Sequence, residues 1–314
     1  MTVVVPTHRR RIDVTGDDRA RYLEDVTTQH LLEVPVTHVR SALVLDPHGA
    51  PLAAFEVVVL GDRLVLVVPD DEVAAYVTDV LALRTFLLDV RFELRDDLVV
   101  AVRGEDAAAV VAGAGLTVVQ GRCRLAGEVL VVHRPDGVDL LGPAGALAEA
   151  EEALLAAGAV RGTDQDLEDA RIRAGEPAWG RELAAPHLPE ELGLLPTHVH
   201  LAKGCYPGQE AVARMWMLGR PRRQLAVVTP TGPVAPGWTA GTGRERVEVT
   251  SVTADASTAL AFVPATATAG DHYGADDGGT IEVVRIVGAE RAVPGHDPAM
   301  VRRRDRGATG PGSR

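Results

Sequence analysis

Short apolar runs, polar turns and a few helical segments follow one another along the whole chain. The runs at 53–60 and 64–68 flank Gly61-Asp62-Arg63, so they are expected to form a β-hairpin. Many short strands with helices inserted irregularly indicate an α+β fold rather than a doubly wound sheet. Further strands are expected at 11–14, 43–45, 86–94, 98–102, 116–119 and 129–133, and helices at 20–26, 73–81, 105–112, 146–157 and 164–174.

The composition changes after Gly219. Four apolar runs separated by Gly- and Pro-rich turns then predict strands at 224–229, 246–252, 259–263 and 280–287 without a convincing helix. We therefore predict a small all-β domain, in the form of a barrel, over residues 226–290. Residues 291–314 are rich in Arg, Gly and Pro and are expected to form a disordered tail.

The densest group of chemically active side chains is the octapeptide Lys203-Gly204-Cys205-Tyr206-Pro207-Gly208-Gln209-Glu210. Its glycines and proline predict a tight loop, and the apolar spacing over 209–218 predicts a helix directly after it. A helix N-terminus and the nearby Lys203 favour the charged form of a thiol, so Cys205 is a candidate reactive cysteine. The alternative is that Cys205 is a small buried apolar residue and Lys203 a solvated charge.

The length of 314 residues, 46% of them hydrophobic, allows two or three domains with substantial cores. Cys123 and Cys205 are far apart and lack the spacing of a disulfide framework or a zinc site, which fits a reducing cytoplasm. We find no secretory signal or apolar run of membrane-spanning length, so we expect a cytoplasmic protein without membrane contact. The net charge of −12 opposes non-specific binding to nucleic acids.

Two other kinds of catalytic site are less well supported. His187, His198 and His200 invite a metal site, but no Cys, Asp or Glu completes a ligand set at the usual spacing. A thiol hydrolase built on Cys205 lacks a local sequence signature. No glycine-rich nucleotide-binding motif follows a strand.

Rare aromatic residues gather around the octapeptide. Trp179, Tyr206 and Trp216 either provide a stacking wall for a flat ring or pack in the core. The cluster of Arg220, Arg222 and Arg223 after the motif helix either binds the anionic tail of a ligand or forms a solvated turn.

The octapeptide resembles the signature K-G-C-[YF]-x-G-Q-E of the YgfZ-type folate-binding proteins, which are related to the aminomethyltransferase (T-protein) of the glycine cleavage system. The resemblance covers about residues 12–225. Residues 14–28 are similar to the opening of the family, and R-I-x-x-G-x-P-x-x-G…L-P-x-E-x-G-L is matched from Arg171 onward. It implies a T-protein/YgfZ-like three-lobed ring, with two interleaved α+β subdomains in residues 1–225 and a C-terminal β-barrel domain.

The same resemblance implies that a central hole binds tetrahydrofolate or a derivative. It implies an accessory protein for iron–sulfur cluster assembly or repair, with iron–sulfur proteins or their assembly factors as partners and a link to tRNA modification. The site residues expected from the motif, the aromatic cluster and the resemblance are Cys205 and Lys203 as the catalytic pair and Tyr206, Gln209, Glu210, Arg173, Trp179 and Arg223 as folate-binding residues.

Two departures from the T-protein pattern bear on the function. Residues 49–54 contain no carboxylate, whereas T-proteins carry there an aspartate that assists one-carbon transfer. Arg173 occupies the place of a folate-binding glutamate. Three functions therefore stay open: a folate-binding accessory protein, a folate-dependent aminomethyltransferase or other one-carbon transferase, and a scaffold that binds partners without a small ligand.

Overall fold

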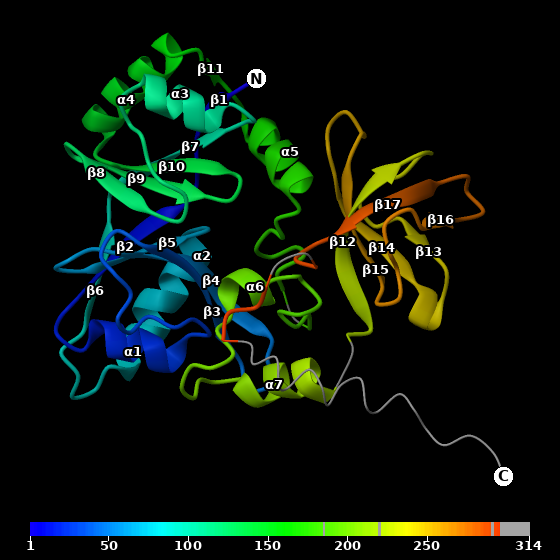
Figure 1. Cartoon of the computed structure of the whole chain (residues 1–314), viewed down its shortest axis with the longest axis horizontal. Coiled ribbons are helices and arrows are strands. Elements are labelled where there is room, and N and C mark those ends of the chain that lie inside the picture. The colour runs from blue at the N-terminus through cyan, green and yellow to red at the C-terminus, as the bar shows by residue number, and fades with distance from the viewer. Residues whose placement is uncertain (185, 219–220, 290–291, 296–314) are drawn as a thin grey trace.

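The computed structural model describes residues 1–184, 186–218, 221–289 and 292–295. It contains three β-sheets, two of which are stacked while the third stands apart (Figure 1). The five-stranded sheet has the order β3 (Val39–Leu45), β4 (Pro51–Val59), β5 (Leu64–Val68), β2 (Arg10–Thr15) and β6 (Arg91–Arg95). The six-stranded sheet has the order β11 (Val160–Arg161), β1 (Val3–Pro6), β7 (Leu98–Arg103), β10 (Gly137–Gly142), β9 (Val129–Arg134) and β8 (Cys123–Ala126).

These two sheets pack face to face through apolar side chains of several of their strands. Val58, Val65 and Val67 of the five-stranded sheet meet Leu130 and Leu141 of the six-stranded sheet in one buried cluster. Helices cover the two outer faces and bury the remaining apolar side chains, which gives a four-layered sandwich. On the five-stranded sheet these are α1 (Arg19–Val26), α2 (Asp71–Ala75), η1 (Tyr76–Leu81) and η2 (Ala82–Arg84), and on the six-stranded sheet α3 (Ala107–Gly113) and α4 (Ala144–Ala156).

The third sheet is C-terminal and barrel-like, with a core of its own. Its order is β13 (Thr239–Ala240), β14 (Val247–Val252), β15 (Ala259–Pro264), β12 (Arg223–Pro230), β17 (Thr280–Ile286) and β16 (His272–Gly274), with the short helix η3 (Gly243–Glu245) between β13 and β14. The α+β fold class that the sequence predicts is therefore confirmed.

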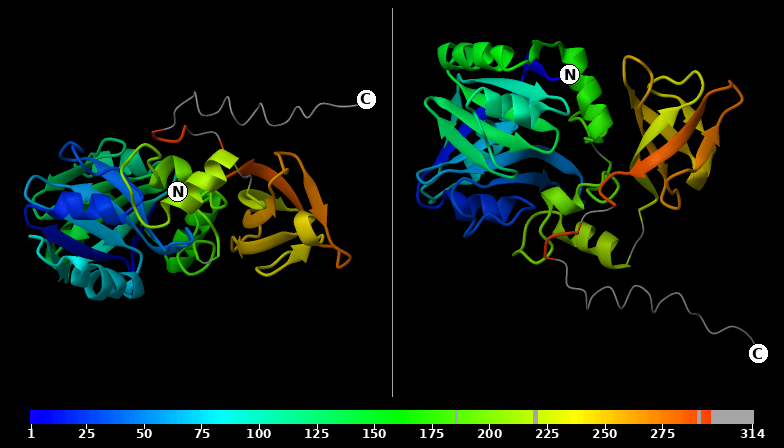
Figure 2. Two further views of the ribbon diagram at one scale, coloured as in Figure 1. Left: turned by 90° about the horizontal axis from the view of Figure 1, so that it is seen from below. Right: turned by 45° about the horizontal axis from the view of Figure 1, so that its top comes forward.

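The segment between the sandwich and the C-terminal sheet holds α5 (Asp164–Ala174), α6 (Leu195–His198) and α7 (Gln209–Leu218). Figure 2 shows α7 lying between the two bodies. A buried cluster at this junction includes Leu43 from β3, Ile172 from α5 and Phe262 from β15. The connecting segment therefore holds the C-terminal sheet against the sandwich.

The hairpin of β4 and β5 and the helix α5 form as predicted. Thr163 accepts a hydrogen bond from the N–H of Asp166, and Gly175 ends the helix with φ 78°, a conformation that favours glycine. One predicted strand is absent, and a second is shorter than predicted. Residues 116–119 form no strand, since Leu116 and Val118 pack beside the core of the six-stranded sheet instead.

The predicted strand at 86–94 shrinks to β6 because its first half is a loop. Phe86 and Leu87 are 84% and 89% exposed, and Leu87 has φ 65°, which no strand tolerates. The sequence pattern also missed β10, whose Gly137 and Asp139 interrupt the apolar run. Among the described residues, no helix combines the length and the apolar character needed to cross a membrane.

Candidate functional site

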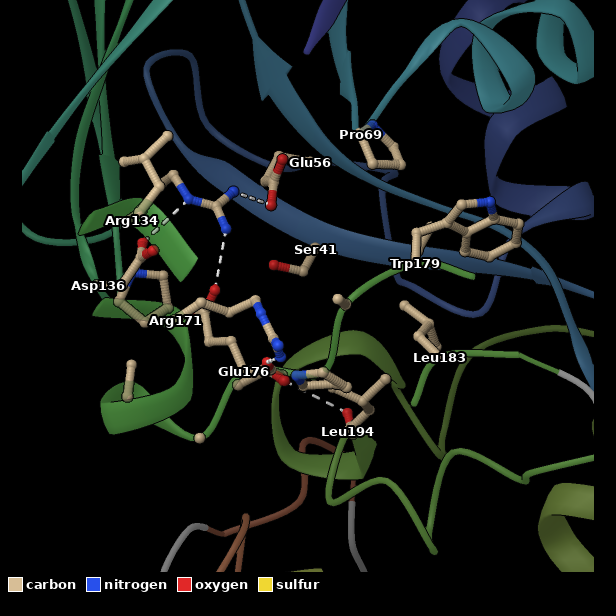
Figure 3. A pocket seen from close by; sticks show the side chains of 18 of the residues that line it. Ser41, Glu56, Pro69, Arg134, Asp136, Arg171, Glu176, Trp179, Leu183 and Leu194 are labelled. Carbon is tan, nitrogen blue, oxygen red and sulfur yellow. Dashed lines mark hydrogen bonds and ion pairs between the residues drawn. The ribbon is translucent and has the colours of Figure 1, made fainter. Parts of the chain in front are cut away.

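A pocket of 1020 Å³ opens where the sandwich, α5 and the C-terminal sheet meet. Its walls come from segments far apart in the chain, including 7–9, 54–56, 134–136, 174–179 and 285–288. We call it the central pocket. Figure 3 shows a charged wall formed by Arg134 and its partners, facing an apolar wall formed by Trp179, Leu183 and Pro69.

Arg134, on the last residue of β9, organises the charged wall. Its guanidinium pairs with Glu56 of β4, with Asp136 at 3.1 Å and with Glu176 at 3.1 Å. Glu56 is also bound by Arg9. Because β4 belongs to one sheet of the sandwich and β9 to the other, this network joins both sheets at the pocket.

The charges in this wall do not balance. Among the described residues, the guanidiniums of Arg9, Arg103 and Arg134 face four linked carboxyls. The carboxyls are those of Glu56, Asp136, Asp139 and Glu176. One carboxyl is therefore in excess of the cations.

Glu176 is the carboxyl whose negative charge is least well neutralised. Burial and the nearby negative charge of Asp136 raise the pKa of Glu176 to about 7, against the opposing effect of Arg134. Burial would also raise the pKa of Glu56, but Arg134 and Arg9 outweigh it and lower that pKa to about 2. The charged wall thus holds Glu56 and Asp136, which stay ionised, and Glu176, which can give or take a proton near neutral pH.

His198 at the end of α6 also lines the pocket. Burial lowers the pKa of His198 to about 4, since the attraction of Glu56 does not compensate for the lost hydration. The imidazole is therefore neutral at physiological pH. It can serve as a hydrogen-bond partner, but it does not add a cation to the pocket.

Trp179 supplies the aromatic part of the apolar wall. Its ring is half-buried and packs against the cores of both the five-stranded sheet and the junction. Of the eight predicted site residues, all of which the structure describes, only Trp179 lines the central pocket. Trp179 therefore packs against both cores, while its role as a stacking wall for a flat ring stays a prediction.

The octapeptide forms a separate feature. Cys205 is exposed, whereas Lys203 is buried against the end of α1. The Lys203 ammonium donates hydrogen bonds to the carbonyl oxygens of residue 24, of Thr27 at 2.5 Å and of Gln29 at 3.2 Å. The alternative in which Cys205 is buried and Lys203 is solvated is thus wrong for both residues.

Burial sets the chemistry of Lys203 and of the neighbouring Tyr206. It lowers the pKa of Lys203 to about 8, although Glu24 favours the charged form, and it raises the pKa of Tyr206 to about 12. The ammonium lies 5.1 Å from the centre of the Tyr206 ring, a cation–π contact. In the described part of the chain, no hydrogen bond or ion pair joins Lys203 to Cys205.

The octapeptide touches the turn that precedes β4. Gly208 has φ 79°, and a Cβ built on it would lie 2.5 Å from the carbonyl oxygen of Asp46. A Cβ on Gly49 would in turn lie 2.9 Å from the Cβ of Ala211 in α7. The structure therefore brings together the octapeptide and the 49–54 segment, the two stretches on which the sequence resemblance places its chemistry.

The remaining predicted site residues lie elsewhere. Arg173 is exposed and pairs with Asp255 at 3.1 Å. Arg223 lies over the ring of Phe262, with its guanidinium carbon 5.0 Å from the ring centre. Glu210 is exposed and pairs with Arg214 at 3.2 Å, while Gln209, the first residue of α7, is half-buried. Arg220 of the predicted arginine cluster lies outside the described residues, as does the tail from 296 onward.

Sequence reasoning missed the charged wall of the pocket. Glu56 lies in a strand whose sequence is otherwise apolar, Arg134 ends the strand β9, and Asp136 lies in the turn after it, without a sequence motif. The one usable signal is a charged residue inside an otherwise buried strand, as at Glu56, because an isolated charge is too costly to bury without a partner. The described residues contain no group of three or more His, Cys, Asp or Glu able to hold a metal ion.

Comparison with known proteins gives distant relatives. No model of a known protein family matches the sequence. The chain is 25% identical over 261 residues to a chloroplastic protein of Arabidopsis thaliana whose name suggests a transferase, covering 76% of this chain and 58% of that protein. It therefore spans less than two thirds of that relative's length. It is 24% identical over 223 residues to the tRNA-modifying protein YgfZ of Vibrio atlanticus (strain LGP32), covering 70% and 67% of the two chains.

Among solved structures, the glycine cleavage system aminomethyltransferase T of Bartonella henselae superimposes with a TM-score of 0.74. The match covers 93% of this chain and 87% of that chain at 17% identity, so it shows that the fold is shared. The Vibrio atlanticus relative supports the resemblance that the octapeptide carries to YgfZ/T-protein-like (GcvT-like) proteins, and the solved structure shows that the T-protein fold is shared.

Proposed function

We propose that the central pocket binds a reduced folate, tetrahydrofolate or a derivative of it. The observation that carries the proposal is the composition of the pocket, in which an aromatic wall at Trp179 faces the charged wall at Arg134. Its volume of 1020 Å³ is at the upper end of small-molecule sites. A pterin is a flat ring with hydrogen-bonding edges, so it suits one apolar and one polar wall.

The individual groups suit the edge of such a ring. The Glu176 carboxyl can donate when protonated and accept when ionised, and the neutral His198 ring can do either. The Arg134 guanidinium already pairs with four carboxyls, those of Glu56, Asp136, Asp139 and Glu176. We therefore assign recognition of the pterin edge to Glu176 and His198, with Arg134 holding Glu176 in place.

The octapeptide is the basis of the second part of the proposal, an accessory role for iron–sulfur proteins. An exposed thiol can reach a partner protein, and Cys205 is exposed on a loop that packs against the turn at Gly49. Iron–sulfur proteins or their assembly factors are the partners we propose for it. The name of the Vibrio atlanticus relative supports a further link to tRNA modification.

Titration calorimetry with tetrahydrofolate tests the folate site. We expect a Kd in the low-micromolar range or weaker, about −8 kcal/mol, because the pocket offers a single aromatic wall. Trp179→Leu should weaken binding about tenfold, the usual value of one stacking contact. Glu149→Gln, which changes an exposed carboxylate on α4 outside the pocket, should bind like the wild type. Absence of both binding heat and a thermal shift would remove the proposal.

A folate-dependent aminomethyltransferase is the second candidate, and one observation favours it. Residues 49–54 lack a carboxylate, but Glu56 enters the pocket two residues later and Glu176 titrates near neutral pH. A proton donor or acceptor is therefore present. We expect no methylenetetrahydrofolate from a lipoyl-bound aminomethyl donor, since Glu56 is held by two arginines. Turnover that disappears in Glu176→Gln would make the transferase the function instead.

A further inference from the structure

A second pocket, of 730 Å³, lies next to the central one. The two pockets share Ser41, Glu56, Arg134, Pro135 and Thr197. The ion pair of Glu56 and Arg134 is thus part of the wall between them. The second pocket does not border α5 or the C-terminal sheet, because none of its described lining residues comes from 164–183 or 223–288.

The lining of the second pocket combines an arginine with several imidazoles, and burial lowers the pKa of His133 and of His200, so these two rings are neutral hydrogen-bonding groups near pH 7. It contains Arg40 of β3 together with His30, His133 and His200. In the described part of the chain, no carboxylate lies within 4.0 Å of the Arg40 guanidinium, which donates only to the carbonyl of Val39, at 3.1 Å. Burial and then the neighbouring Arg122 lower the pKa of Arg40, so no anion offsets its charge.

The acidic groups near this pocket are already neutralised. Glu56 is held by Arg9 and Arg134. Glu24 accepts hydrogen bonds from the N–H of Leu31 and from that of Leu32 at 3.2 Å, and its other oxygen lies 3.1 Å from Nδ1 of His30. Neither carboxylate is therefore available to pair with Arg40.

The histidines add donors without forming a metal site. The rings of His30 and His200 lie 5.3 Å apart, and none of the described side chains forms a metal-binding group. The chain carries a net charge of −12, so long-range attraction of anions is weak and recognition must come from the pocket itself. A half-buried arginine without a counter-ion and several imidazoles are the groups that bind an oxyanion.

We propose that the second pocket is a binding site for a phosphate or carboxylate group of a ligand, with Arg40 as its principal contact. This goes beyond the folate proposal, because Arg40 and the three histidines do not line the central pocket. A phosphate and a carboxylate both accept two parallel hydrogen bonds from a guanidinium, so Arg40 can bind either group. An oligophosphate and a chain of glutamates are the two sources that an experiment can separate.

Calorimetry at low ionic strength, with inorganic pyrophosphate and in a second series with tri-γ-glutamate, tests the proposal. We expect at least one probe to bind the wild type, and Arg40→Gln to weaken it by about tenfold or more, the usual value of a charged hydrogen bond. The matched control is Arg124→Gln, because Arg124 is an exposed arginine on β8 outside both pockets. The probe that binds identifies the source of the anion.

Arg40→Lys keeps the charge and should keep part of the affinity, while thermal melting shows that each variant is folded. Failure of both probes to bind the wild type would overturn the proposal. So would equal losses in Arg40→Gln and Arg124→Gln, because binding would then follow overall charge rather than this pocket.

Discussion

The chemistry of the central pocket depends on one carboxyl that its neighbours do not neutralise. Arg134 is shared among Glu56, Asp136 and Glu176, so no single cation is reserved for Glu176. Burial then raises its pKa to about 7. A network with one more arginine would have made this wall purely structural. The imbalance leaves a group whose protonation can change when a ligand binds.

Glu176→Gln should change how stability depends on pH. The pKa of Glu176 is raised in the folded protein above the ordinary value of 4.5, so its contribution to stability is full below pH 4.5 and is lost as pH rises to about 7. Glutamine does not ionise and avoids this loss. Urea unfolding should therefore show the variant gaining about 1–3 kcal/mol relative to the wild type between pH 4.5 and pH 8.

Glu210→Gln is the matched control for this measurement. Glu210 has a side chain that is 86% exposed, and its change should be nearly independent of pH. The assignment fails if the two variants show the same pH dependence.

Cys205 and Cys123 should differ strongly in reactivity. Cys123 is buried on β8 between the two sheets, and burial raises the pKa of its thiol to about 11. Cys205 is exposed. At pH 7.5 an alkylating agent should modify Cys205 at least tenfold faster, which peptide mass spectrometry measures. Preferential labelling of Cys123 in the folded protein would contradict the structure.

The same two cysteines separate structural from functional roles. Cys205→Ala should retain folding and tetrahydrofolate binding, because the exposed side chain contributes little packing. It should abolish support of iron–sulfur enzymes in a complementation assay if the thiol acts on a partner. Full complementation would assign the importance of the octapeptide to Lys203 and Gly208.

At the scale of elements, the octapeptide holds neighbouring elements together as well as carrying an exposed thiol. Lys203 caps the carbonyls that follow α1, and Gly208 lets α7 begin directly on the turn at Asp46. A lysine ammonium near a helix C-terminus meets carbonyls that have no partner within the helix. The loop therefore joins α1, β3 and α7.

Gly208→Ala should destabilise the protein more than Gly204→Ala. At Gly208 the left-handed backbone costs about 1–2 kcal/mol for an L-residue, and the Cβ would also clash with the carbonyl of Asp46. We expect a total loss of about 2–4 kcal/mol in the free energy of unfolding. A Cβ on Gly204 would meet no atom within 4 Å, so that variant should lose about 0.5 kcal/mol or less. Equal losses would show that the close packing is absent in solution.

Local signals explain why some elements could be predicted from the sequence. Thr163 and Gly175 mark both ends of α5, and Gly61-Asp62-Arg63 marks a hairpin, because capping and turn chemistry act within a few residues. The apolar run at 86–94 gives no such signal. Its Phe86 and Leu87 are exposed, and only the tertiary structure decides which apolar residues pair in a sheet.

The candidate site could be predicted only in part for the same reason. The octapeptide is contiguous and carries its own resemblance, so it could be found from the sequence. The wall of the central pocket combines Glu56, Arg134 and Glu176, which are 120 residues apart at the extremes and touch only after both sheets have packed. The spacing of residues along the chain therefore cannot predict these contacts.

At the scale of the whole molecule, one buried carboxylate ties the C-terminal sheet to the rest. Glu182 is fully buried and accepts hydrogen bonds from Thr250 and Ser251 of β14, both at 2.6 Å. On the other side it binds Arg171 of α5 at 3.2 Å and the N–H of Ala178 at 2.9 Å. The central pocket has residues from both sides of this joint in its walls.

Glu182→Ala should loosen this joint. Removing the carboxylate leaves a half-buried Arg171 with one ion-pair partner fewer and the Ser251 hydroxyl without its acceptor, while the Thr250 hydroxyl keeps only the carbonyl of Leu260. We therefore expect a loss of about 3–5 kcal/mol in unfolding free energy. Limited trypsin digestion should then release the C-terminal sheet as a separate fragment, and tetrahydrofolate binding should weaken because 285–288 no longer holds its place in the pocket wall. Glu149→Ala, at an exposed position of α4, should behave like the wild type in both assays. If Glu182→Ala resists trypsin as well as this control does, the C-terminal sheet is held by its apolar contacts with α5 and β3 rather than by the carboxylate.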